Sequence, residues 1–137
     1  MEQEVLIAVA IMTIRLIVGF MFFFQGYDKV FKLGLRNLIQ ALETTIGATS
    51  IPKKIIAPIA AVSSYLELMS GALLIVGIFT SFALTALCIN LAVVSIGFSK
   101  YKPMWDESHV FVRLVLIIAL MLLPSEWDHY SLQYLIR

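Results

Sequence analysis

Charged residues are scarce in this sequence: lysine, arginine, aspartate and glutamate make up 14% of its 137 residues, against roughly a quarter in soluble domains. The single cysteine, Cys88, excludes an internal disulfide and a C-x-x-C redox pair. The two histidines, His109 and His129, stand at opposite ends of one apolar block, which disfavours haem ligation within the chain. Clustered metal ligands, a nucleophile–base set and a basic tract are also missing, so the sequence carries no signature of a metal site, a catalytic site or nucleic-acid binding.

Hydrophobic residues, by contrast, make up 61% of the chain, and they are concentrated in four blocks. A helix that crosses a bilayer needs about 20 predominantly apolar residues. The blocks that approach this length are residues 5–25, 55–78, 81–98 and 109–123, of which the last is short. We therefore predict an all-α integral membrane protein, a four-transmembrane-helix bundle that forms a single domain over residues 1–137.

The connection between the first two spans predicts a further helix, over residues 34–47. Its apolar residues recur at helical spacing, with polar residues at the other positions. The apolar set is Leu35, Leu38, Ile39, Leu42 and Ile46. This pattern is typical of an amphipathic helix that lies at the membrane interface or caps one end of a bundle.

Lysines and arginines outside the spans predict the orientation. With four spans, the two longer connections share one face of the membrane, and they hold Lys29, Lys32, Arg36, Lys53, Lys54, Lys100 and Lys102. The opposite face holds only Arg137. Because positive loops stay in the cytoplasm, we expect cytoplasmic connections and both termini outside, in a bacterial cytoplasmic (inner) membrane. The leader Met1–Glu4 is acidic, unlike that of a signal peptide, so the first block is expected to be a retained helix.

Two charges lie near the middle of predicted spans, where an ionised side chain costs roughly 2.5 to 3.5 kcal/mol. Arg15 stands about ten residues into the first span, and Glu67 stands near the centre of the second. Similar depth would allow them to pair and to neutralise each other. The sequence therefore predicts an Arg15–Glu67 ion pair between the first two spans.

Polar and small residues follow the same helix faces as these charges. The predicted ligand-binding or buried polar network comprises Arg15, Gln25, Lys29, Glu67, Asn90 and Arg113. The predicted helix-packing residues are Gly19, Gly26, Ser70, Gly71 and Gly97, since small side chains let helices approach closely. Arg113 has two alternatives, to join the network or to extend toward Asp106 and Glu107.

The network itself supports two interpretations: it holds the bundle together, or it binds a ligand. Intramembrane charges are often functional, but a self-compensating pair also serves a purely structural bundle. Arg15 and Arg113 set against Glu67 leave one positive charge unmatched, which favours an anionic or carbonyl-bearing ligand, or a partner chain.

Two motifs resemble those of the DoxX family of small four-helix membrane proteins. Residues 15–31 read RLIVGFMFFFQGYDKVF, and residues 67–80 read ELMSGALLIVGIFT; the segment Ser125–Asp128 is similar to the family's closing segment, though less closely. Carried over by position, the family-pattern residues are Arg15, Gly19, Gly26, Lys29, Glu67 and Gly71. Gln25 stands where the family often has histidine, which weakens any case for proton or electron chemistry there.

The resemblance implies an association with quinone-linked oxidoreductases or with membrane-protein assembly. We therefore expect a non-catalytic accessory or assembly subunit of a larger, quinone-linked membrane complex, with no catalytic residues of its own. The expected partners are the lipid bilayer and another membrane protein or a second copy of the chain, and the expected cofactor, if any, is a quinone. The alternatives are a quinone-binding oxidoreductase component and a small transporter or lipid-handling protein.

Overall fold

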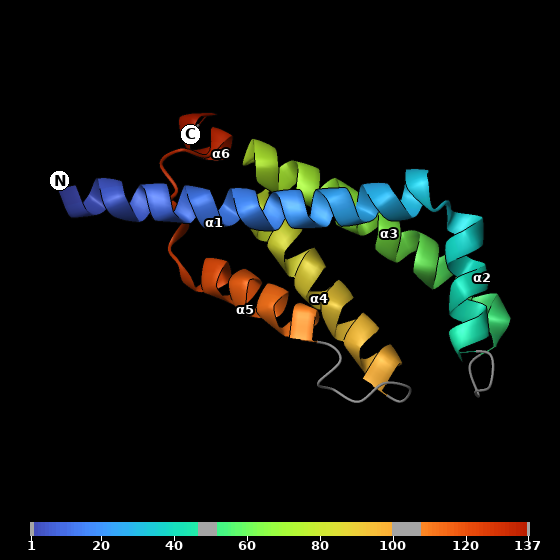
Figure 1. Cartoon of the computed structure of the whole chain (residues 1–137). Coiled ribbons are helices and arrows are strands. Elements are labelled where there is room, and N and C mark those ends of the chain that lie inside the picture. Colours follow the sequence, from blue (N-terminus) through green and yellow to red (C-terminus); the bar gives the residue numbers. More distant parts are fainter. Residues whose placement is uncertain (1, 47–51, 100–107, 137) are drawn as a thin grey trace.

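The computed structural model describes residues 2–46, 52–99 and 108–136, and within them it is helical with no strand (Figure 1). Its elements are α1 (Glu2–Tyr27), a π-helical turn η1 (Asp28–Lys32), α2 (Leu35–Ile46), α3 (Lys53–Val76), α4 (Thr80–Ser99), α5 (Ser108–Leu122), a 3-10 turn η3 (Ser125–Trp127) and α6 (Leu132–Ile136). The all-α prediction is confirmed. Two of these helical segments, Glu2–Lys32 and Lys54–Val76, are long and apolar enough to cross a bilayer, whereas Thr80–Ile96 and Val110–Leu122 are shorter apolar helices.

The turn between α3 and α4 follows from one glycine. Gly77 adopts a left-handed conformation with φ of 78°, which ends α3 two residues before the predicted end of the second span. Its amide and that of Ile78 both donate to the carbonyl of Leu73, at 2.8 and 3.1 Å, and so satisfy the end of the helix. α4 begins three residues later and runs back beside α3.

α1 and α3 are in unusually close contact because glycines meet backbone at their interface. A Cβ atom on Gly71 would lie 2.4 Å from the backbone nitrogen of Phe23, and one on Gly26 would lie 2.5 Å from that of Leu68. Neither position leaves room for any side chain. These contacts set the register, in which α1 residues from Arg15 onward lie antiparallel to the second half of α3.

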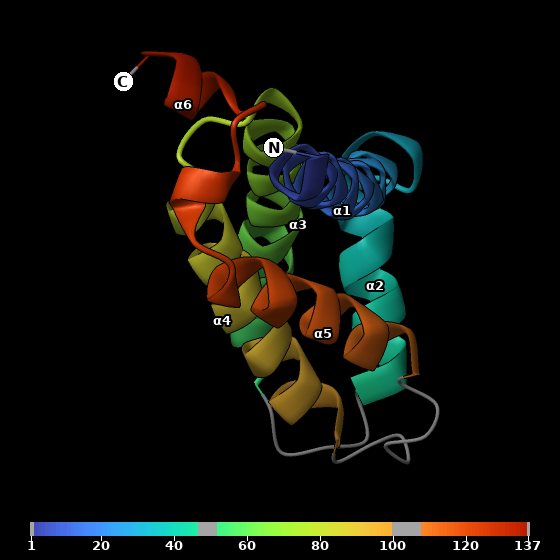
Figure 2. The same ribbon diagram turned by 90° about the vertical axis from the view of Figure 1, so that its left-hand side faces the viewer.

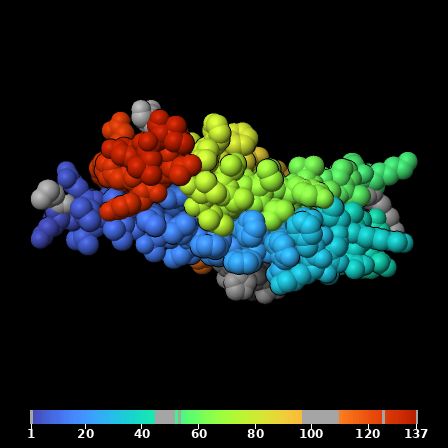
Figure 3. Space-filling view, turned by 90° about the horizontal axis from the view of Figure 1, so that it is seen from above, coloured from blue at the N-terminus to red at the C-terminus, as the bar shows by residue number. Residues whose placement is uncertain are grey.

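The same register carries the first half of α1 past the end of α3 (Figure 1). There the C-terminal segment, residues 124–136, folds back against α1 and beside the α3–α4 turn (Figure 3). A hydrogen bond from the amide of Gln133 to the carbonyl of Gly77, 3.0 Å long, joins this segment to the turn.

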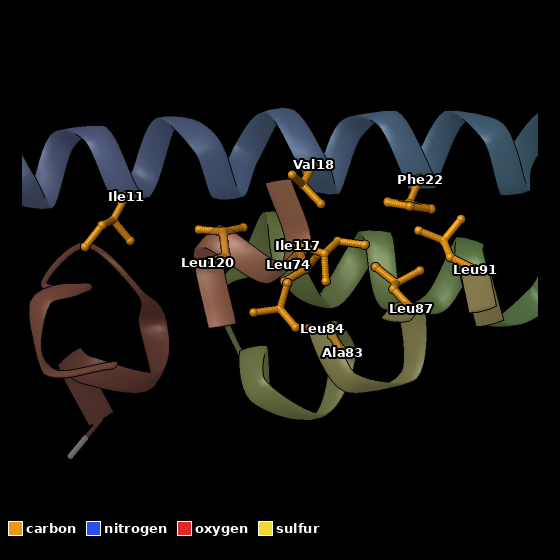
Figure 4. Close-up of a cluster of buried hydrophobic side chains, with 10 residues drawn as sticks. All are labelled: Ile11, Val18, Phe22, Leu74, Ala83, Leu84, Leu87, Leu91, Ile117 and Leu120. Carbon is orange, nitrogen blue, oxygen red and sulfur yellow. The ribbon is translucent and has the colours of Figure 1, made fainter. Parts of the chain in front are cut away.

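The apolar core lies between α1, α3, α4 and α5. Phe22 and Val18 of α1 point toward Leu74 of α3, Leu87 of α4 and Ile117 of α5, and all five are at most 1% exposed (Figure 4). Figure 2 shows α1 nearly end-on, with α3, α4 and α5 on one side of it and α2 descending from its far end. This core fixes how α4 and α5 face α1, and so where their polar residues meet.

α2 has the predicted amphipathic character. Its apolar residues Leu38, Ile39 and Leu42 are half-buried, while Arg36 and Gln40 are exposed. The helix follows the C-terminal end of the α1 segment and packs against α3 (Figure 1).

Candidate functional site

The carboxylate of Glu67 is the centre of a buried polar group. Its side chain is 2% exposed, and both of its oxygens accept hydrogen bonds from Nζ of Lys29, at 2.9 and 2.7 Å. Asn90 Nδ2 of α4 donates to Oε1 at 3.3 Å. The lysine comes from the π-helical turn that follows α1, a local irregularity that is frequent at functional sites.

A second contact lies one helical turn earlier on α1. Gln25 Oε1 accepts a hydrogen bond from Arg113 Nη1 of α5, and the guanidinium carbon of Arg113 lies 5.9 Å from the centre of the Phe22 ring. Since Gln25 and Lys29 are four residues apart, their side chains lie on one side of the helix. We call Gln25, Lys29, Glu67, Asn90 and Arg113 the interior polar cluster, to which α1 with its π turn, α3, α4 and α5 all contribute.

Arg15 does not belong to this cluster, and the predicted Arg15–Glu67 pair is wrong. Its Nη1 donates to the carbonyl of Leu74 at 2.6 Å, its Nη2 donates to that of Tyr130 at 3.2 Å, and its Nε lies 3.2 Å from Asp128 Oδ2. Gly77 makes room for it, because a Cβ there would lie 2.6 Å from Arg15 Nη1.

The pairing failed because it assumed that the midpoints of the two spans align. Arg15 is level with Leu74, which is seven residues from Glu67 along α3, or about 10 Å at 1.5 Å per residue. The glycine contacts set Gly26 against Leu68, so the cation that reaches Glu67 is Lys29, three residues after Gly26.

Asp128 is the functional side chain that reasoning from the sequence missed as a partner. Its side chain is 10% exposed, and burial raises its pKa, although the nearby Arg15 and His129 lower it. The raised pKa means that the ion pair does not fully offset the desolvation of the carboxylate. The signal in the sequence was the resemblance of Ser125–Asp128 to the family's closing segment, but the segment is far from Arg15 along the chain and nothing local predicts their contact.

The unmatched positive charge is therefore Arg113 and not Arg15. Arg15 has Asp128, and Lys29 has Glu67, whereas no carboxylate in the described residues lies within ion-pair distance of Arg113. Of its two predicted alternatives, the structure has it bound to Gln25. Asp106 and Glu107 lie outside the described residues.

The predicted packing residues have different surroundings. Gly26 and Gly71 touch the opposing backbone, while a Cβ on Gly19 would lie 3.0 Å from Cγ1 of Ile75. Ser70 is buried, at 4% exposure, beside Gly71. The surroundings of Gly97 lie outside the described part of the chain.

The chemistry open to this site is that of ion pairs and amide hydrogen bonds. Across residues 2–46, 52–99 and 108–136, no three histidine, cysteine, aspartate or glutamate side chains are grouped so that they could hold a metal ion. The donors are Lys29 and Asn90, which bind the Glu67 carboxylate, and the Arg113 guanidinium, which binds the amide oxygen of Gln25. Such a set binds oxygen acceptors and anions.

Comparison with known protein families assigns the chain. The DoxX family model matches residues 10–99, roughly two thirds of the sequence. The chain belongs to the DoxX family. No curated protein and no solved structure shows significant similarity to it. DoxX membership makes it a membrane protein.

The match begins within α1, runs to the end of α4 and stops before α5. In this DoxX chain the family-pattern residues fall into two groups. Those that join α1 and its π turn to α3 are Gly19, Gly26, Lys29, Glu67 and Gly71, whereas Arg15 binds the C-terminal segment. Arg113 and Asp128 lie beyond the matched residues.

Proposed function

We propose that this DoxX protein is a non-catalytic membrane subunit that assists or assembles with a larger membrane complex. The family resemblance implies that this complex handles quinones. The observation that carries the proposal is the hydrogen bonding of Glu67, the one carboxylate of the interior polar cluster. Both of its oxygens are bound by Lys29 and one also by Asn90, so the acid joins α3 to α4 and to the π turn after α1, with three of its roughly four lone-pair positions occupied.

We further propose that all four apolar helices cross the bilayer. The support is that the outward faces of α4 and α5 are apolar. Ile89 and Ile96 of α4 are 61% and 71% exposed, and Val115 and Leu122 of α5 are 63% and 79% exposed. A soluble protein would place polar residues at such positions. Such apolar faces are stable in contact with lipid. A short helix such as α5 can still span the bilayer where the bilayer is locally thinner.

The proposed orientation places the α1–α2 and α4–α5 connections in the cytoplasm. Its support is the excess of lysine and arginine in those connections. We expect an alkaline phosphatase fusion after Arg137 to be active, and one inserted at Gly34 to be inactive, because the phosphatase folds only outside the cytoplasm. Activity at Gly34 and none at Arg137 would reverse the assignment.

The subunit role is tested by purification in a mild detergent from membranes of the source organism. We expect the tagged chain to elute with a discrete membrane protein in a fixed ratio, and the purified chain alone to show no redox-active spectrum. The measurements are mass spectrometry of the eluate and solvent extraction for quinones.

The runner-up is a quinone-binding oxidoreductase component. It is favoured because Arg113 has no carboxylate partner in the described residues and could donate a hydrogen bond to a quinone carbonyl. Purified chain that retains one quinone per molecule, and loses it in an Arg113→Gln variant that still folds, would replace the subunit role with this one. A Lys32→Met variant is the matched control, because Lys32 is an exposed cation on the π turn and its ion-pair partner is the exposed Asp28.

A further inference from the structure

Arg113 is a cation whose hydrogen-bonding capacity is only partly used. Its Nη1 is bound to the neutral oxygen of Gln25, and its Nε is buried without an acceptor in the described part of the chain. No hydrogen bond from Nη2 to a described residue is present, and Nη2 is not among the buried unpaired atoms. Nη2 is thus the guanidinium nitrogen that remains for a ligand.

The existing neighbours do not neutralise the charge. An amide oxygen carries only a partial negative charge, and the Phe22 ring attracts the guanidinium only through its quadrupole. The other interior cations, Arg15 and Lys29, each have a carboxylate. The interior charges of the described residues therefore sum to one surplus positive charge, located at Arg113.

We propose that Arg113 binds the phosphate of an anionic phospholipid at the α1–α5 side of the bundle. Nη2 can donate a charge-assisted hydrogen bond to a phosphate oxygen, and a full negative charge is what the site lacks. A neutral carbonyl ligand would leave the surplus charge in place. The bilayer around the chain supplies such phosphates at high local concentration.

The surroundings fit a lipid better than a free ion. The outward face of the same helix turn is apolar, since Phe111 and Val112 of α5 are 47% and 58% exposed and can contact acyl chains. Lys29 lies one turn from Gln25 and keeps 26% of its side chain exposed. Basic positions between membrane helices are typical of sites for anionic headgroups. The site is independent of the proposed subunit role.

The test is lipid binding to the purified full-length chain in a zwitterionic detergent, followed by native mass spectrometry and thermal unfolding. The probes are phosphatidylglycerol, phosphatidylcholine with the same acyl chains, and inorganic phosphate alone. We expect one phosphatidylglycerol per chain, held about tenfold more tightly than phosphatidylcholine, and Arg113→Gln to remove that preference. Arg36→Gln is the matched control, since Arg36 is an exposed arginine of α2, and we expect it to keep the preference.

Three results would overturn the proposal: equal binding of the two lipids by the unmodified chain, an unchanged preference in Arg113→Gln, or stabilisation by inorganic phosphate without any by phosphatidylglycerol. Where Arg113→Gln does not fold, Gln25→Met gives a second measurement. It removes the only acceptor seen for Arg113 in the described residues, so we expect the dependence of its thermal stability on phosphatidylglycerol to increase. A decrease would contradict the site.

Discussion

Lys29→Met is expected to lower the free energy of unfolding in detergent by about 3 to 5 kcal/mol, because it leaves a buried carboxylate without its cation. Glu67 is 2% exposed and would keep only the Asn90 amide, at 3.3 Å. Glu67→Gln is expected to have a smaller effect, since the freed Lys29 is 26% exposed and reaches polar surroundings more easily. The measurement is unfolding by a denaturing detergent, followed by circular dichroism.

The double variant Lys29→Met/Glu67→Gln decides whether the pair is a structural unit. We expect it to recover most of the lost stability, since no isolated charge remains. Lys32→Met is the control, because the Lys32–Asp28 pair is exposed and screened by water, so its loss is expected to change stability little. A double variant no more stable than Lys29→Met would show that Glu67 does not depend on that lysine.

The pair that the sequence predicted offers an internal comparison. Arg15 and Glu67 share no partner in the described residues. The effects of Arg15→Leu and Glu67→Gln are therefore expected to add in the double variant, in contrast to the rescue expected for Lys29 and Glu67. Rescue by Arg15→Leu would contradict the register of α1 against α3.

Gly71→Ala is expected to destabilise the chain by about 3 kcal/mol, at the upper end of what overpacking costs. The new Cβ would lie 2.4 Å from the Phe23 nitrogen, and backbone atoms yield only if the helices separate. Gly26→Ala, with 2.5 Å to the Leu68 nitrogen, is expected to behave alike. The separation would also move Lys29 from Glu67, so part of the loss arises in the polar cluster.

Gly19→Ala is the matched control at the same interface. Its nearest obstacle is a side-chain carbon of Ile75 at 3.0 Å, which a small rotation relieves, although backbone atoms follow at 3.1 and 3.2 Å. We expect it to cost clearly less than Gly71→Ala, because its nearest backbone atom lies at 3.1 Å and that of Gly71 at 2.4 Å. Equal effects at all three glycines, or a gain of stability at Gly71, would show that α1 and α3 are not in backbone contact.

Much of the fold could be predicted because helix formation in apolar segments is local. Runs of apolar residues indicated every long helix, and the spacing of Leu38, Ile39 and Leu42 indicated the amphipathic α2. Boundaries were missed where one residue adopts a special conformation: Gly77 ends α3 early, and the π turn extends the first helical segment to Lys32.

The members of the interior polar cluster were also predictable, but their partners were not. Glu67, Asn90, Gln25, Lys29 and Arg113 could be named from their types and positions, because a polar side chain in an apolar helix must face the protein. The choice between Arg15 and Lys29 as partner of Glu67 depends on how far α1 slides along α3. That distance is set by glycine contacts between segments far apart in the chain, and a sequence without its fold does not contain it.

The sequence by itself determined that this is an all-helical membrane protein of the DoxX family with charges in its interior, because hydropathy and side-chain type are properties of single residues and their near neighbours. Only the tertiary structure decided that Arg15 binds the C-terminal segment through Asp128, that Lys29 neutralises Glu67, and that Arg113 carries the surplus charge. The physical reason is that an ion pair depends on a few ångströms of separation, and packing across the whole chain sets that separation.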